Sequence, residues 1–200
     1  MKTIIKATAT ILTILTMTAC SSDDSKDAPV EEPLSEKVEY IFSEPTQIAS
    51  DGITIIDLEV AANAKIIDPT KITLELRLNH QQAMDIDFTY VPPDGDGHSI
   101  LIGAGGYNKF NPNSTLTFRS SHTQMIADEY PNNTIPTGDY TSTSFDNEIY
   151  PVEKPLFNSL LNKNTEGTWK FVFSDVGDTE SGDVYWIKLI FEEGALEVNP

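Results

Sequence analysis

Two stretches near the C-terminus, WKFVF at residues 169–173 and VYWIKLIF at residues 184–191, decide the fold class of this 200-residue chain. In the first stretch, three aromatic residues alternate with Lys170, Val172 and Ser174, and the second stretch alternates less cleanly. A period of two is typical of a β-strand with one buried face. We therefore expect two strands, whose tryptophans Trp169 and Trp186 belong to the core because of the apolar area that they bury.

Outward from these strands, short β-branched or aromatic runs alternate with clusters of Gly, Pro, Asn and Asp, and no dozen-residue window keeps a helical period. Further strands are predicted at residues 53–60, 72–78, 86–91, 99–102 and 116–119. The clearest is 72–78, where four aliphatic residues alternate with Thr73, Glu75 and Arg77. The pattern predicts an all-β domain whose strands have one buried and one wet face.

Residues 120–164 carry few periodic signals and are interrupted by Pro131, Pro136, Pro151 and Pro155. Such a long stretch without elements is unusual in a compact domain. We expect ordered turns here, with one short helical turn near residues 155–161.

The N-terminus has the form of a signal peptide at residues 1–19. Lys2 and Lys6 precede an apolar, uncharged stretch at residues 7–19, which is shorter than the roughly 20 residues that a membrane-spanning helix needs. The next residue, Cys20, is the single cysteine, so no intramolecular disulfide can form. Residues 17–20 resemble a bacterial lipobox, which implies that Cys20 is lipidated and anchors the protein, each buried methylene contributing about 0.8 kcal/mol.

Residues 20–37 are mostly Ser, Asp, Glu, Lys, Pro and Ala, a composition that cannot bury enough apolar surface to fold. We expect a disordered acidic tether, followed by one domain at residues 38–194. The run SSDD at residues 21–24 resembles the acidic leader of surface-exposed Gram-negative lipoproteins. It implies export to the outer membrane and display at the cell surface.

The chain is strongly acidic, with a net charge of −18. Removing residues 1–19 takes away Lys2 and Lys6, which leaves 11 basic against 31 acidic residues and a net charge of −20. We therefore do not expect nucleic acid as a partner. The charge suits solubility and cation binding, and a solvated acidic surface is a better explanation of it than a specific cation site.

Residues 167–189 resemble the P (Homo B) domain of subtilisin-like proprotein convertases. In both, a Gly-Thr-Trp sequence enters a strand, an aspartate ends it, an acidic turn follows, and a second strand carries Trp, hydrophobic, polar, Leu. The residues that carry this pattern here are Gly167, Thr168, Trp169, Asp175, Gly177, Asp178, Asp183, Trp186 and Leu189. Weaker matches at residues 80–86, 90–95 and 150–160 extend the resemblance over about 53–191, although Met84 replaces the family's usual glycine and 108–137 has no counterpart.

The resemblance implies a jelly-roll-like β-sandwich of about eight strands, similar to galactose-binding domains. In convertases this domain packs beside the protease domain and supports its folding and calcium dependence. No segments resembling the subtilisin triad occur here, so we expect a protein that is not an enzyme. It would be a binding or adhesion module for a protein or glycan, or an accessory domain that stabilises a separately encoded subtilisin-like serine endopeptidase.

The three histidines, His80, His98 and His122, have no metal-ligand spacing. We expect His80 to be structural, with Asp85 as its main acceptor across a tight connection between strands. A hydrolase that uses these histidines is a third alternative.

Calcium is the one cofactor that the sequence suggests, at the acidic turn that contains Asp175, Asp178 and Asp183. Closely spaced carboxylates repel each other unless they are solvated or bridged by a cation. Residues 94–97 also alternate Asp and Gly, but Gly105 stands where an EF-hand has its closing glutamate. Residues 103–106 lack the lysine and serine of a phosphate-binding loop and are interpreted as a turn.

Three tyrosines outside the regular strands, Tyr107, Tyr130 and Tyr140, are the candidates for contacting a ligand. They lie in or beside the long loops at residues 108–150, and recognition usually occurs in loops held by a rigid scaffold. The predicted binding surface is therefore this loop region.

Overall fold

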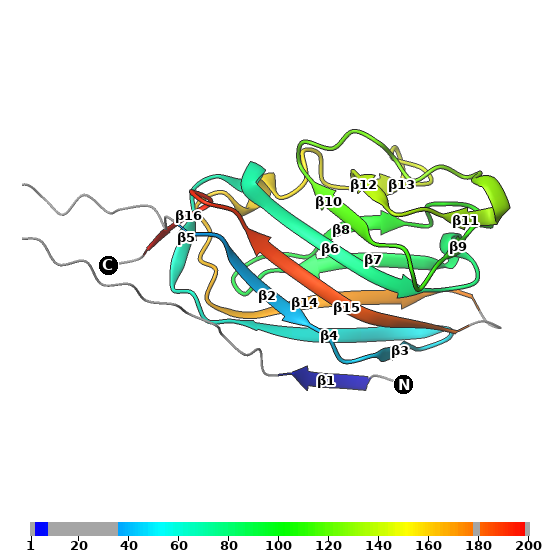
Figure 1. Ribbon diagram of the computed structural model, residues 1–200, viewed down its shortest axis with the longest axis horizontal. Helices are drawn as coiled ribbons and strands as arrows, with labels where there is room; N and C mark the ends of the chain where they lie inside the picture. Colours follow the sequence, from blue (N-terminus) through cyan, green and yellow to red (C-terminus); the bar gives the residue numbers. More distant parts are fainter. Residues whose placement is uncertain (1–2, 8–35, 178–180, 199–200) are drawn as a thin grey trace, which may run out of the picture.

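The computed structural model describes residues 3–7, 36–177 and 181–198, and Figure 1 shows its arrangement. These ranges contain sixteen strands and four short 3-10 helices, so the all-β prediction is confirmed. Within them, no helix is long and apolar enough to cross a membrane. The predictions for most of the signal peptide at residues 1–19, for Cys20, for most of the tether and for Asp178 lie outside the described residues.

The first six-stranded sheet is centred on β14 (Gly167–Asp175), which pairs antiparallel with β4 (Gly52–Val60) and with β7 (Ile86–Val91). Beyond β7 lie β8 (His98–Ile102), antiparallel, and β13 (Thr143–Ser144), parallel to β8. At the other edge, β1 (Thr3–Ala7) runs parallel to β4. Residues from both halves of the chain are thus interleaved in one sheet.

The second sheet contains β12 (Gly138–Tyr140), β10 (Leu116–Arg119), β6 (Ile72–Asn79), β15 (Gly182–Phe191) and β2 (Val38–Phe42), with β3 (Thr46–Ile48) also paired to β15. Two small ribbons complete the fold, β9 (Lys109–Phe110) with β11 (Thr134–Ile135) and β5 (Ala64–Ile66) with β16 (Leu196–Val198). After β1, the next strand along the chain is β2, which begins at Val38, and the last is β16, which ends at Val198.

The two sheets enclose one core and form a sandwich (Figure 1). Trp169, Phe171 and Phe173 are fully buried, as the alternating pattern predicts. The ring of Phe88 stacks on that of Phe173, with centroids 4.6 Å apart and planes 12° apart. Aromatic pairs of this kind add to the stabilisation from buried area, so β14 contributes the centre of the core.

All seven predicted strands exist, but the number expected, about eight, is too low. The strands that were missed are mostly two or three residues long, such as β9, β11 and β13. A period of two cannot be recognised in so few residues. The region at residues 120–164 holds β11 to β13, η3 (Pro131–Asn133) and the short helical turn η4 (Asn158–Leu160), which confirms ordered turns there.

Trp186 is not a core residue, contrary to the prediction. The pairing of β15 with β6 shifts between Val184 and Trp186, where Tyr185 is the additional residue of a β-bulge. The shift reverses the alternation, so that Ile187 and Leu189 are buried and the indole lies half-buried on the outer face. There the Lys188 ammonium lies 5.7 Å from the ring centroid, within range of a cation–π contact.

Candidate functional site

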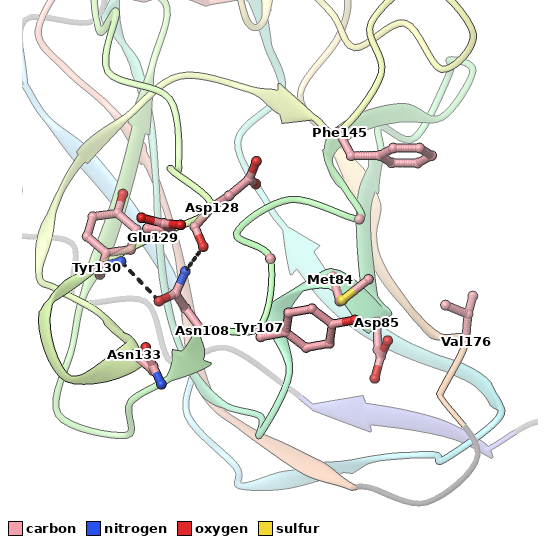
Figure 2. A pocket seen from close by; sticks show the side chains of 12 residues that line it. Met84, Asp85, Tyr107, Asn108, Asp128, Glu129, Tyr130, Asn133, Phe145 and Val176 are labelled. Carbon is pink, nitrogen blue, oxygen red and sulfur yellow. Dashed lines mark hydrogen bonds between the residues drawn. The ribbon is translucent and has the colours of Figure 1, made fainter.

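A cavity of about 920 Å³ lies where several connections between strands meet, and Figure 2 shows its lining. We call it the loop pocket. Its size falls in the range of small-molecule and peptide side-chain sites. The lining residues are Met84, Asp85, Gly103, Gly106, Tyr107, Asn108, Asp128, Glu129, Tyr130, Asn133, Phe145 and Val176.

These residues come from five separate segments. Met84 and Asp85 belong to η2 (Ala83–Asp85) between β6 and β7, and residues 103–108 connect β8 to β9. Residues 128–133 precede β11, Phe145 follows β13, and Val176 follows β14. Much of the lining thus falls within residues 108–150, the region predicted to bind a ligand.

The turn at residues 103–106 is tightly held against the pocket. Gly103, Gly105 and Gly106 have positive φ angles of 54°, 95° and 54°, which side chains rarely tolerate. A Cβ on Gly106 would lie 2.8 Å from the carbonyl oxygen of Asp128. These positions require glycine for close packing and backbone geometry.

Asp87 fastens the same turn, because its Oδ1 accepts a hydrogen bond of 2.9 Å from the Gly103 N–H. Burial raises the pKa of Asp87 above its usual range, and the bond from Gly103 opposes that shift. The Met84 N–H also donates to the Gly106 carbonyl at 3.1 Å. The turn is therefore a fixed wall of the pocket.

Asn108 ties two of the walls together. Its buried amide Nδ2 donates to the carbonyls of Gly105 at 2.5 Å and Asp128 at 2.8 Å. Its Oδ1 accepts from the Tyr130 N–H at 3.2 Å, as the dashed lines in Figure 2 show. Since buried amides with full hydrogen bonding resist displacement, the segment at residues 128–130 is preorganised.

Several large apolar side chains at the loop pocket are exposed. Tyr107 is 75% exposed, Phe145 63% and Val176 62%, and Met84 lies beside Tyr107 in Figure 2. The ring of Phe145 also contacts that of exposed Tyr150, at a centroid distance of 5.2 Å. Gathered apolar groups of this kind mark interaction sites more often than scattered ones do.

The polar side of the pocket is acidic. Asp85, Asp128 and Glu129 line it, and among its lining residues in the described chain there is no lysine, arginine or histidine. Asp85 lies beside the start of the turn after β14, since a Cβ on Gly177 would be 2.6 Å from its Oδ2. The pocket therefore combines aromatic surface with negative charge.

Two of the three tyrosine candidates line the loop pocket, Tyr107 and Tyr130. The hydroxyl of Tyr130 accepts a hydrogen bond of 3.0 Å from the Ala127 N–H. Tyr140, in contrast, is fully buried and donates to the Pro136 carbonyl at 2.9 Å. Burial raises the pKa of Tyr140. The side chain of Tyr140 faces the core at the end of β12, so it offers no surface to a ligand.

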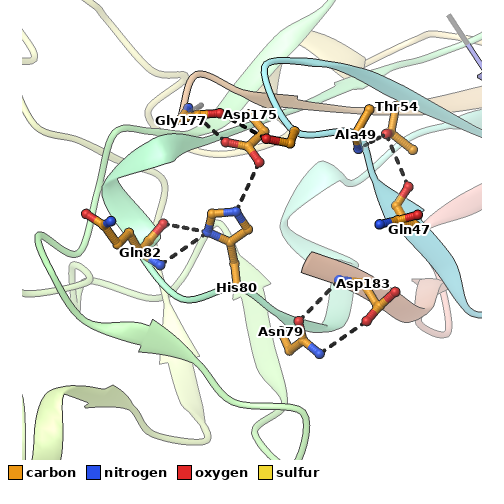
Figure 3. Close-up of polar contacts among 10 residues, drawn as sticks. Gln47, Ala49, Thr54, Asn79, His80, Gln82, Asp175, Gly177 and Asp183 are labelled. Carbon is orange, nitrogen blue, oxygen red and sulfur yellow. Dashed lines mark hydrogen bonds and ion pairs between the residues drawn. The ribbon is translucent and has the colours of Figure 1, made fainter. Parts of the chain in front are cut away.

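His80 is structural, but its acceptor is not Asp85. Its Nε2 donates to Oδ2 of Asp175 at 3.1 Å, and its Nδ1 lies 2.8 Å from the carbonyl oxygen of Gln82 (Figure 3). Both His80 and Asp175 side chains are completely buried. Oδ1 of Asp175 also accepts from the Gly177 N–H at 2.9 Å. The pair joins the end of β6 to the end of β14, a contact across 95 residues of sequence that local spacing could not reveal.

The two predicted calcium ligands that the structure describes, Asp175 and Asp183, bond to different partners. Asp175 is occupied by His80 and Gly177, whereas Oδ2 of Asp183 accepts from Asn79 Nδ2 at 3.3 Å. Among the described residues, no group of three or more His, Cys, Asp or Glu is arranged to hold a metal ion. Calcium binding with Asp178 stays a prediction from the sequence.

Ser159 and His98 line another, smaller cavity of about 400 Å³, and Glu153 lies close to both residues. Ser159 Oγ lies 3.1 Å from His98 Nε2, but His98 Nδ1 is 3.9 Å from Glu153 Oε2, too far for a hydrogen bond. Oε1 of Glu153 accepts from the Ser159 N–H at 2.7 Å, and Oε2 accepts from the buried Tyr90 hydroxyl at 2.6 Å. This carboxylate holds the loop in place rather than orienting a catalytic histidine.

No family model matches the chain, and no curated protein matches it. Among solved structures it is similar to the serine protease of Aeromonas sobria, at 13% sequence identity and a TM-score of 0.44, over 82% of this chain and 28% of that one. A complex of the same protease with a chaperone matches at 12% identity and a TM-score of 0.43, over 84% and 28%. This chain thus spans 28% of the length of the matched chains, and a likeness this weak carries no argument about activity. The resemblance to the P domain stays a prediction from the sequence.

Proposed function

We propose that this protein is a non-catalytic binding module, held at the outer-membrane surface by a lipidated Cys20, whose loop pocket binds an extended segment of a partner protein. The observation that carries the proposal is the pocket itself, about 920 Å³ in volume and bordered by the exposed rings of Tyr107 and Phe145. Exposed aromatic side chains around a concavity are typical of the centres of protein interfaces.

The rigidity of the pocket supports this role. Asn108 and the glycine turn at residues 103–106 hold the walls through partly buried hydrogen bonds. A preformed site loses little conformational entropy when a ligand binds. Burying the exposed part of Tyr107 and Phe145 against a ligand would contribute about 25 cal/mol for each Å² of apolar surface.

A peptide library provides the test of this function. The purified domain would select from an unbiased phage-displayed library of linear peptides, and each selected clone would be measured against a Tyr107→Ala/Phe145→Ala variant. The matched control is Ile53→Ala/Leu161→Ala, which removes two side chains exposed to 48% and 47% away from the pocket lining. We expect clones that lose binding to the first variant and keep it with the second.

Two outcomes contradict the proposal. One is a selection that yields no clone dependent on Tyr107 and Phe145. The other is a glycan array in which the domain binds a sugar through the same two residues while peptides fail to bind, which would replace a protein ligand by a glycan.

The anchor has its own test. Cells that express the full chain and are given an alkyne-tagged fatty acid should label the protein that begins at Cys20, and Cys20→Ala should abolish the label, because an acyl chain needs this thiol and the chain has no other cysteine. If the domain is displayed on the outside of the cell, protease added to intact cells should digest it. Labelling that survives Cys20→Ala would refute the anchor.

The partner could also be a separately encoded subtilisin-like protease, for which this chain would act as an accessory domain. The support is the resemblance of residues 167–189 to the P domain. A protease encoded in the same genome, produced with and without this protein, should then lose thermal stability in its absence and recover it with the wild-type domain but not with Tyr107→Ala/Phe145→Ala. Equal stability in both cases would remove this form of the proposal.

A further inference from the structure

We infer that the loop pocket recognises a cationic side chain, an arginine in preference to a lysine, carried on an extended peptide with apolar neighbours. The inference rests on the proposed function and specifies the chemistry of the ligand. It concerns the charge of the pocket, whereas the proposed function concerns only whether the pocket binds a peptide.

Charge complementarity is the first argument. The pocket lining carries Asp85, Asp128 and Glu129 and, within the described residues, no basic side chain. Asp128 and Glu129 are adjacent and exposed, so their mutual repulsion is reduced when a cation binds between or beside them. A ligand that is acidic would be repelled by the same groups, and by the excess of acidic residues in the whole chain.

The aromatic surface is the second argument. Tyr107 and Phe145 present exposed rings at the pocket that carries these carboxylates (Figure 2). A cation above an aromatic ring is attracted by the ring quadrupole. Guanidinium is planar and weakly hydrated, stacks on rings and donates to carboxylates in a fork, so arginine satisfies both features better than lysine does.

The position of the carboxylates is the third argument. The backbone at residues 128–130 is fixed by Asn108, which bonds the Asp128 carbonyl and the Tyr130 N–H. The carboxylate side chains of Asp128 and Glu129 are thus presented on a fixed backbone while remaining exposed to solvent. Ionic contacts made at these exposed carboxylates should weaken as the salt concentration rises.

The experiment uses four labelled peptides that differ at one position. A central arginine, flanked on each side by leucine and glycine, is replaced in turn by lysine, by citrulline and by glutamate, and binding is measured by fluorescence anisotropy at low and physiological salt. Citrulline keeps the shape of arginine without its charge. We expect the arginine peptide to bind at least about tenfold more tightly than the citrulline peptide, which corresponds to ~1.4 kcal/mol.

The protein variant is Asp128→Asn/Glu129→Gln, which keeps size and hydrogen-bonding capacity at two exposed positions. Its matched control is Asp96→Asn/Glu166→Gln, which removes the same charge from exposed positions outside the pocket lining. We expect the first double variant to lose the preference for arginine over citrulline and the second to retain it. Loss in both would show a general field effect and overturn the inference.

Failure of the inference differs from failure of the proposed function. Equal binding of arginine and citrulline peptides, with both lost in Tyr107→Ala/Phe145→Ala, overturns the cationic ligand and leaves a peptide-binding pocket. Selected phage clones that depend on the two aromatic residues and lack basic residues likewise overturn the cationic ligand alone. If no peptide depends on Tyr107 and Phe145, the proposed function is refuted and the inference with it.

Discussion

Replacing Asp175 with alanine should destabilise the domain more than any other single change of a charged residue in the described chain. The carboxylate is fully buried and accepts two hydrogen bonds, from His80 Nε2 at 3.1 Å and from the Gly177 N–H at 2.9 Å. The variant leaves both donors without an acceptor in a site that excludes water. Each unsatisfied buried donor costs about 1–3 kcal/mol, so the free energy of unfolding should fall by about 2–6 kcal/mol.

That loss is large against the total stability of a natural domain, about 5–15 kcal/mol. For a chain of this size, each kcal/mol lowers Tm by about 2–4 °C. Asp175→Asn keeps the shape and one acceptor oxygen but places an amide N–H₂ toward the other donor. Asp175→Asn should therefore lower the free energy of unfolding by about half as much as Asp175→Ala does, because one donor keeps its acceptor.

The assay is equilibrium urea unfolding followed by tryptophan fluorescence, because buried Trp169 lies in the same strand as Asp175. Asp96→Ala, at an exposed position, is the control and should stay within about 0.5 kcal/mol of wild type. An Asp175→Ala variant as stable as this control would refute the reasoning, since it would mean that the His80 and Gly177 donors find other partners or water.

Three other single sites give further tests. Gly182→Ala should lower Tm sharply in thermal unfolding, because a Cβ there would lie 2.2 Å from the carbonyl oxygen of Asn79, and a variant with unchanged Tm would contradict the packing of β15 on β6. Asp87→Asn should raise Tm at pH 7, because burial raises the pKa of Asp87, so its protonated form favours folding and that contribution is lost as pH rises through the raised value. The gain in Tm should disappear below pH 3.8, the usual pKa of an aspartate, because Asp87 is then protonated in both the folded and the unfolded chain. An Asp87→Asn variant with a lower Tm than wild type at pH 7 would contradict this prediction. The purified chain and its His98→Ala variant should hydrolyse a chromogenic ester at the same background rate, and a higher rate that His98→Ala abolishes would reopen a hydrolytic role.

The core of β14 illustrates what could be predicted from the sequence. Alternation of aromatic and polar residues over five or more positions identifies a half-buried strand, and Trp169, Phe171 and Phe173 are buried as predicted. Trp186 shows the limit of the same argument. A single additional residue in a β-bulge turns every following side chain to the other face, and nothing in the local pattern marks that residue.

By itself, the sequence determined the all-β class, seven of the strands and the acidic charge, because these follow from local periodicity and composition. Only the tertiary structure decided which residues meet. Asp175, not Asp85, became the partner of His80, and Tyr140 was placed in the core while Tyr107 remained exposed. Five segments from residues 84 to 176 converge on the loop pocket. Their convergence depends on strand order and register, which are set by packing of the two sheets over the whole chain and leave no trace in the spacing of neighbouring residues.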